Sequence, residues 1–152
     1  MMFRPYQKTD KQQIIDIFLS NCPKYFKFSD QTDLEDFLDH YADSNYLVIL
    51  KDQKVIGCGG HYTKPNMHGI AWVMFERNAL GYKNLKSIST TFYNEIEKRI
   101  KTEGLFYDIN INTTQLMAPF FESFGFTTYQ VIKNGFGGNL DEYKMIKKLT
   151  YD

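Results

Sequence analysis

The chain has 152 residues, 43% of them hydrophobic and 16% aromatic, a composition that excludes an intrinsically disordered protein. Its 18 basic and 18 acidic residues give a formal net charge of zero, so global charge favours neither nucleic acid nor an anionic membrane surface. No stretch approaches the roughly 20 apolar residues that cross a bilayer. We therefore expect one cytoplasmic domain over residues 1–152, with no nucleic-acid partner and no membrane partner.

The N-terminal segment predicts a strand and two helices. A short strand over residues 2–6 leads to a helix over 10–19, where apolar residues recur at helical spacing. A second helix over 32–41 has the same spacing on one side and an acidic opposite side. The two helices are separated by Pro23, which ends the first of them.

A hairpin follows, with strands over 46–50 and 55–62 joined by a short turn. Its second strand contains Gly57, Gly59 and Gly60. Because glycine weakens a strand interior, these residues indicate either a bulge or a place where something approaches the backbone closely. Residues 63–68 are expected to form a loop into the next strand.

The two cysteines, Cys22 and Cys58, lie far apart in the sequence and lack the spacing of a zinc site. We interpret both as reduced, small buried residues. A catalytic thiol has no support from neighbouring residues, and we expect no metal centre.

Residues 70–111 predict the unit around which the rest of the chain packs. A nearly continuous apolar run over 70–75 is typical of a buried strand, and apolar residues at steps of three and four over 85–100 predict a long helix. A second strand over 105–111 completes a strand, helix and parallel strand. The turn between the first strand and the helix contains Gly81 and could hold a phosphate on the helix N-terminal amides.

The C-terminal segment predicts a helix and two strands. The helix spans 114–124, contains Pro119 near its start and ends at Gly125. The strands, 127–133 and 142–149, form an antiparallel pair across a flexible GFGG loop. The order of elements predicts an α/β or α+β fold, in which helices cover both faces of a mixed sheet.

Three segments carry a resemblance to a known superfamily: VIGCGGHY, WVMFERNALGYKNL and PFFESFGF. Together they resemble the third strand, the fourth strand with its pyrophosphate loop, and a late helix end of the GNAT superfamily of acyl-CoA-dependent N-acetyltransferases. The resemblance extends over nearly the whole chain. It implies a mostly antiparallel sheet of six to seven strands with a splayed parallel pair and about four helices on its two faces.

The resemblance also implies acetyl-CoA as co-substrate. The main chain of Val73, Met74 and Phe75 would pair with the pantetheine arm, with one amide facing the thioester oxygen. The implied cofactor-binding set continues with the turn and with residues after the next strand: Gly81, Tyr82, Lys83, Asn84, Leu85, Asn112, Thr114 and Phe121.

The pyrophosphate loop departs from the superfamily pattern. In the ungapped alignment Leu80, Lys83 and Leu85 occupy its key Gln or Arg, Gly, and Gly or Ala positions. An alignment shifted by two residues recovers Gly81 but places Lys86 on the apolar side of the helix, so the ungapped one is preferred.

For the catalytic base the candidates are Glu76, at the end of the fourth strand, and His61, after the glycine pair. Either could instead be an ordinary surface or hydrogen-bonded residue. Where many members of the superfamily have a tyrosine acid, the sequence has Phe121, which cannot donate a proton. Protonation would then come from water or from another group, and Tyr82, Tyr93 and Tyr107 are candidates.

We therefore expect an N-acetyltransferase that moves an acetyl group directly from acetyl-CoA to a primary amine of a small molecule or peptide. The alternative is a catalytically weak or inactive GNAT-like module that binds CoA or a protein partner. The acidic side of the helix over 32–41 could attract a cationic amine, or could simply be solvated. A homodimer is an implication of the resemblance alone.

Overall fold

The computed structural model describes residues 2–77 and 81–150, so Leu80, a key position of the preferred loop alignment, lies outside the described residues. The helices and strands, in chain order, are β1 (Met2–Pro5), α1 (Lys11–Ser20), α2 (Gln31–His40), β2 (Tyr46–Lys51), β3 (Lys54–Lys64), β4 (Met67–Phe75), α3 (Tyr82–Thr102), β5 (Ile109–Thr113), α4 (Ala118–Glu122), β6 (Thr127–Gly137) and β7 (Leu140–Lys147). Short 3-10 turns, Lys8–Asp10 and Phe28–Asp30, precede α1 and α2.

The described strands form one mixed sheet in the order β1-β2-β3-β4-β5-β7-β6. The β1–β2, β2–β3, β5–β7 and β6–β7 pairs are antiparallel. The β4–β5 pair is parallel, and its register joins His68 to Ile109 and Gly69 to Asn110. This topology confirms the predicted mixed, mostly antiparallel sheet with a parallel pair.

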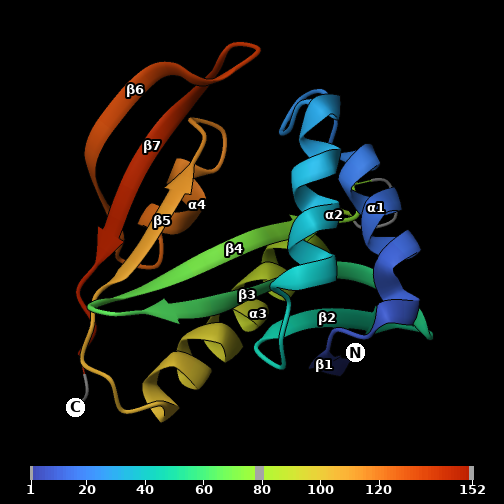
Figure 1. Cartoon of the computed structure of the whole chain (residues 1–152), viewed down its shortest axis with the longest axis horizontal. Coiled ribbons are helices and arrows are strands. Elements are labelled where there is room, and N and C mark those ends of the chain that lie inside the picture. The colour runs from blue at the N-terminus through green and yellow to red at the C-terminus, as the bar shows by residue number, and fades with distance from the viewer. Residues whose placement is uncertain (1, 78–80, 151–152) are drawn as a thin grey trace. The chain divides into compact units, whose positions relative to one another are not determined.

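The chain divides into two compact units. The first contains residues 1–61 and 71–103, and the second contains residues 62–70 and 104–152. In the first unit, α1 and α2 lie side by side over one face of the sheet and α3 runs along the other (Figure 1). In the second unit, β5 and the β6–β7 hairpin form a three-stranded segment together with α4 (Figure 1).

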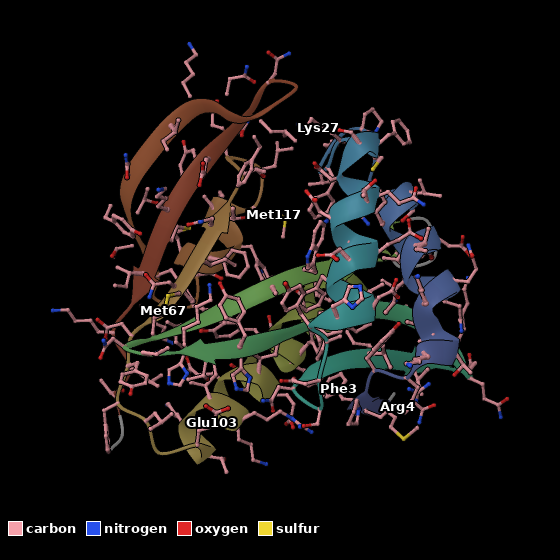
Figure 2. The ribbon with its side chains drawn as sticks, in the orientation of Figure 1. Phe3, Arg4, Lys27, Met67, Glu103 and Met117 are labelled. Carbon is pink, nitrogen blue, oxygen red and sulfur yellow. The ribbon has the colours of Figure 1, made fainter. Side chains whose placement is uncertain are left out.

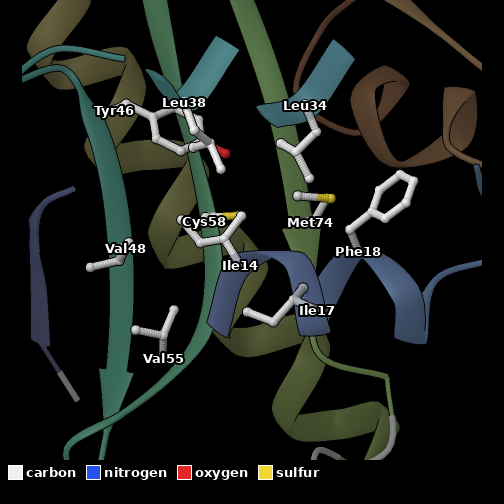
Figure 3. Packing of buried hydrophobic residues seen from close by; sticks show 10 residues of the cluster. All are labelled: Ile14, Ile17, Phe18, Leu34, Leu38, Tyr46, Val48, Val55, Cys58 and Met74. Atoms are coloured by element: carbon white, nitrogen blue, oxygen red, sulfur yellow. The ribbon is translucent and has the colours of Figure 1, made fainter. Parts of the chain in front are cut away.

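A hydrophobic core fills the space between the sheet and the first two helices (Figure 3). The helices contribute apolar residues at steps of three and four, as the sequence predicts, and β2 contributes alternate residues. The two β3 members lie on either side of the register shift in that strand. The buried members of this cluster are Ile14, Ile17, Phe18, Leu34, Leu38, Tyr46, Val48, Val55, Cys58 and Met74.

The glycines of β3 lie where neighbouring groups of the chain approach the strand backbone closely. A Cβ atom at Gly60 would collide with the main chain of Asn45 and Tyr46, and one at Gly59 would lie 2.9 Å from Cγ2 of Val73. The β2–β3 register also shifts between Ile49 and Leu50, which places a bulge in β3. Both predicted readings therefore hold, and the groups that approach the backbone belong to the chain itself.

Two predicted connections are wrong because strands extend further than their apolar runs. Residues 63–68 are not a loop: β3 continues to Lys64 and β4 begins at Met67, so Pro65 and Asn66 form a tight turn in which Asn66 has φ +72°. The GFGG segment is likewise mostly strand, because β6 continues to Gly137 before it turns.

Two predicted elements are shorter than expected. Residues 105–108 carry no strand, and Phe106 is 74% exposed, so β5 begins only at Ile109. The helix predicted over 114–124 is reduced to Ala118–Glu122, because residues 114–117 form a turn in which the Thr114 carbonyl accepts hydrogen bonds from Met117 and Ala118. Among the described residues, no helix combines the length and apolar character needed to cross a bilayer.

Candidate functional site

The end of β4 forms one wall of the candidate site, entirely within the first unit. Side chains alternate along the strand, so that Met74 packs into the core below α1 and α2 while Phe75 meets Phe92 of α3, with ring centroids 6.1 Å apart. Val73 faces the same side as Phe75, next to Gly59. The predicted cofactor strand, Val73 to Phe75, is therefore held from both faces.

Trp72, the residue before this segment, has an unusual main-chain conformation. Its φ of +46° lies in the left-handed region, which costs a bulky L-residue about 1–2 kcal/mol. The strained peptide is held by its carbonyl, which accepts a 2.9 Å hydrogen bond from the hydroxyl of Tyr46 and a weaker 3.8 Å contact from Sγ of Cys58. Tyr46 is 2% exposed, and burial raises the pKa of its hydroxyl well above the usual value.

The start of α3 presents open main-chain donors. Gly81 is the N-cap residue, and the first intrahelical bond described here is the 2.9 Å bond from the Leu85 amide to the Gly81 carbonyl. Because the first amides of a helix have no carbonyl one turn back, those of Tyr82, Lys83 and Asn84 point out of the helix end. No acidic residue lies in this first turn, so the end is electropositive.

The space around Gly81 is also open. A Cβ atom there would meet no atom of the described residues within 4 Å, and the φ of −67° at Gly81 is one that any residue adopts. The fold itself therefore does not require glycine at this position. Of the other two key loop positions, Lys83 is exposed and Leu85 is half-buried on the core side of the helix.

A cluster that the sequence analysis did not single out fixes the end of β4. The buried side chain of Asn21 donates to the carbonyls of Ile17 at 2.7 Å and Phe75 at 3.0 Å. Its oxygen accepts a 2.6 Å hydrogen bond from Nε of Arg77, whose guanidinium lies 4.0 Å from the ring centre of Tyr25. These contacts join residues 54 and 56 positions apart, a separation at which no sequence pattern signals a pairing.

Comparison with solved structures identifies the fold. A ribosomal-protein-alanine N-acetyltransferase from Brucella melitensis superposes with a TM-score of 0.69 at 16% identity, over 98% of this chain and 100% of that one. An aminoglycoside 6'-N-acetyltransferase complexed with coenzyme A gives 0.71 at 14% identity, over 97% of each chain. An acetyltransferase assigned to the GNAT family from Desulfovibrio desulfuricans gives 0.75 at 15% identity, over 98% and 99%.

The chain has the GNAT acetyltransferase fold. No protein-family model matches the sequence. No curated protein matches it either. The likeness is therefore one of three-dimensional structure, and it confirms the fold that the three sequence segments implied.

Within the GNAT fold the two candidate bases do not come together. His61 is almost fully buried, and its Nε2 lies 2.7 Å from Oε1 of Glu103, just past the end of α3 (Figure 2). Since α3 has 21 residues, roughly 30 Å of helix separates this pair from Gly81. Glu76 is half-buried directly after β4, where its amide donates a 2.9 Å hydrogen bond to the Ile56 carbonyl.

The remaining predicted cofactor residues lie in the second unit. Asn112 is exposed on β5 opposite Lys144, and Thr114 is buried in the turn before α4. Phe121 of α4 is 2% exposed and packs edge-on against Phe126 at 5.6 Å. Its ring is thus part of the packing of this unit.

The tyrosines that could replace a tyrosine acid are mostly engaged. The Tyr93 hydroxyl donates a 2.9 Å hydrogen bond to Glu97, and burial raises the pKa of this buried group. Tyr107 packs against His68 in the second unit, with ring centres 5.5 Å apart and ring planes inclined by 47°. Only the main chain of Tyr82 is described, as the first residue of α3.

Proposed function

We propose that the chain is an N-acetyltransferase that transfers an acetyl group from acetyl-CoA directly to a primary amine. The observation that carries this proposal is the order of two features along the chain within the first unit. The extended segment Val73 to Phe75 ends β4, and Gly81, six residues later, is the N-cap of a helix with open amides. A thioester arm and a diphosphate fit these two features in that order.

The main chain would supply most of the catalysis. Bound along β4, the thioester would have its carbonyl oxygen within reach of an amide of the Val73 to Phe75 segment, which would stabilise the negative charge that forms when the amine attacks. The C–N bond then forms, the C–S bond breaks and CoA leaves as the thiolate. Holding the two reactants together lowers the barrier by several kcal/mol, about 7 or more in favourable cases, without any covalent enzyme intermediate.

We assign the role of general base to Glu76, acting through water. It directly follows the β4 segment that would hold the thioester, whereas the ring of His61 is buried against Glu103 at the far end of α3. The proton that the base removes from the attacking amine returns to solvent. CoA thiols have a pKa in the usual thiol range near 8.5, so the thiolate leaves readily and takes its proton from water in the absence of a tyrosine acid.

Cofactor binding is tested by thermal shift with CoA and acetyl-CoA. A ligand at about 100 times its dissociation constant stabilises the folded state by about 2.7 kcal/mol, which raises the midpoint by several degrees. We expect that shift with both ligands and none with adenosine alone. Unchanged midpoints at millimolar CoA would contradict the proposal.

The second candidate is a module with this fold that binds CoA and has little or no transferase activity. The observation in its favour is Phe121, buried at the position where a tyrosine acid is expected. Stabilisation by CoA with no thiol release over a panel of primary amines would select this alternative. If Phe121→Tyr then gained transferase activity, the missing group would be the tyrosine acid at this position.

A further inference from the structure

Trp72 projects from the strained point of β4 toward α1 and α2, opposite to the side that Val73 and Phe75 face. Its indole is half-buried, so one part packs on the protein and the rest is accessible. Among the described residues its N–H donates no hydrogen bond, which leaves a polar handle on an otherwise apolar surface. Trp72 therefore presents a partly exposed aromatic ring directly before Val73, the first residue of the proposed thioester segment.

Two phenylalanines complete an aromatic surface around this indole. The ring of Phe26, from the connection between α1 and α2, lies 5.7 Å from the indole at an interplanar angle of 33°. Phe18 lies below both rings, 6.4 Å from Trp72 and 5.7 Å from Phe26. Phe18 is fully buried while Trp72 and Phe26 are only partly so, which makes Phe18 the support and the other two the accessible face.

The chain holds this surface rigidly. The Tyr46 hydroxyl fixes the main chain of Trp72, and the Asn21 side chain fixes the carbonyl of Phe75, three residues further along β4. A rigid aromatic face loses little entropy when a ligand packs on it. It would select ligands by their apolar area and flatness, since it presents one hydrogen-bond donor and no charged side chain of its own.

We propose that the surface of Trp72 and Phe26 binds the acceptor, and that the acceptor is a primary amine bearing an aromatic or flat apolar group. This inference rests on the proposed acetyl transfer at β4, because the surface borders the residue where the amine must attack. The amine comes from one of two sources with the same chemistry, a small arylalkylamine or a peptide whose first residue is aromatic. A strongly polar amine gains nothing from this face.

Trp72 is the only tryptophan of the chain, so its fluorescence reports directly on the surface. The probes are 2-phenylethylamine against ethanolamine, and a short peptide beginning with Phe against one beginning with Ser, each titrated in the absence of acetyl-CoA. We expect saturable changes in Trp72 emission with the aromatic member of at least one pair, and about tenfold tighter binding than for its polar partner. The pair that responds identifies the source of the acceptor.

Variants separate the surface from general effects on folding. Phe26→Leu removes one accessible ring and should weaken binding of the aromatic probe several-fold while leaving the polar probe unchanged. Phe26→Tyr keeps the ring and should restore binding, which covers the case that Phe26→Leu perturbs the fold. Tyr41→Leu, at an aromatic residue 69% exposed beyond α2, is the matched control and should have no effect.

Equal affinities for the aromatic and polar members of both pairs, or equal effects of Phe26→Leu and Tyr41→Leu, would overturn the inference. Because the titration contains no acetyl-CoA, its outcome is independent of the proposed reaction. Acetylation restricted to polar amines would contradict the aromatic acceptor and support the proposed acetyl transfer. Binding of aromatic amines without any thiol release would support the binding surface and contradict the proposed acetyl transfer.

Discussion

The hydroxyl of Tyr46 donates a 2.9 Å hydrogen bond to the main-chain carbonyl of Trp72, across the core of the first unit. This bond joins β2 to the one point of β4 where a non-glycine residue has a left-handed conformation. A buried side chain thereby offsets backbone strain at the entrance to the proposed thioester segment. Strain retained in this way is typical of sites where the backbone geometry has a function.

Removing that hydroxyl tests the connection between strain and activity. Tyr46→Phe keeps the ring and loses the hydrogen bond, which should lower the free energy of unfolding by about 1 kcal/mol. We expect kcat for acetyl transfer to fall several-fold while KM for acetyl-CoA changes little, because the cofactor contacts at α3 are intact. Tyr6→Phe, at the ring that packs edge-on to Tyr46, is the control. Equal kinetics for the two variants would show that the bond has no role in catalysis.

Gly81 offers a test in which stability and binding separate cleanly. No atom of the described residues crowds Gly81 and its φ is ordinary, so Gly81→Val should lower the unfolding midpoint by only about 2–4 °C, the cost of a less favourable N-cap residue. The same side chain would stand beside the helix amides and keep a diphosphate away, and we expect CoA to bind at least about tenfold more weakly. Thr91→Val, on the exposed side of α3, should bind CoA normally. Unchanged CoA affinity in Gly81→Val would exclude this helix start as the cradle.

We expect that aspartate, the residue closest in shape to asparagine, cannot replace Asn21 without a large loss of stability. Asn21→Asp keeps an acceptor for Arg77 but turns a carboxylate oxygen toward the carbonyls of Ile17 and Phe75, which both now accept from the amide. The loss of two buried donated bonds should destabilise the fold by about 2–4 kcal/mol, measured by urea unfolding. Asp16→Asn, on the exposed side of α1, is the control for the charge change. A stable Asn21→Asp variant would mean that these carbonyls find water instead.

The Asp10–Arg4 pair predicts how stability depends on acid pH. Two 2.8 Å hydrogen bonds from Arg4 (Figure 2) lower the pKa of Asp10. Burial raises this pKa in part, and the hydrogen bond from the Gln7 amide lowers it further. The unfolded chain therefore takes up this proton at a higher pH than the folded chain does. The stabilisation is complete above the unfolded pKa near 3.9 and is lost as the pH falls through the lower folded value.

Asp10→Asn checks this origin. At neutral pH the variant should be less stable than the native chain by about 2 kcal/mol, since a hydrogen bond to a charged group is replaced by a neutral one. The difference should shrink as the pH falls below 4, because the native carboxylate then becomes protonated. A difference that stays constant with pH would assign the acid dependence to other carboxylates.

The sequence predicts the central unit well because its pattern is local. The helix stripe that contains Ile88, Phe92 and Ile96 is buried as its spacing indicates. The strand before it is buried at Ile70, Met74 and Phe75 and only partly buried over residues 71–73. Capping is less well predicted. The spacing of Asp10 and Gln13 is that of a capping box, but the Asp10 carboxylate binds Arg4 and the Gln13 side chain accepts a hydrogen bond from the Val55 amide.

The errors arise where long-range contacts decide. The side chains over 105–108 alternate as in a strand, but these residues do not form one. The first hydrogen bond to β4 is the one that the Asp108 carbonyl accepts from the His68 amide, directly before β5 begins, and Phe106 stays exposed. His61 is a candidate base by residue type, but its partner Glu103 is 42 positions away and cannot be found from spacing. The same holds for Tyr46 and Trp72.

The most direct test of the account is release of CoA thiol from acetyl-CoA by the native chain, measured with a thiol reagent in the presence and absence of a panel of primary amines. Burial raises the pKa of Cys58 to about 12, so this thiol stays silent, and the amine-free reaction subtracts any signal from Cys22. We predict amine-dependent thiol release matched mole for mole by N-acetylated amine. Thiol release that is no faster with any amine than without it would contradict the proposed transferase.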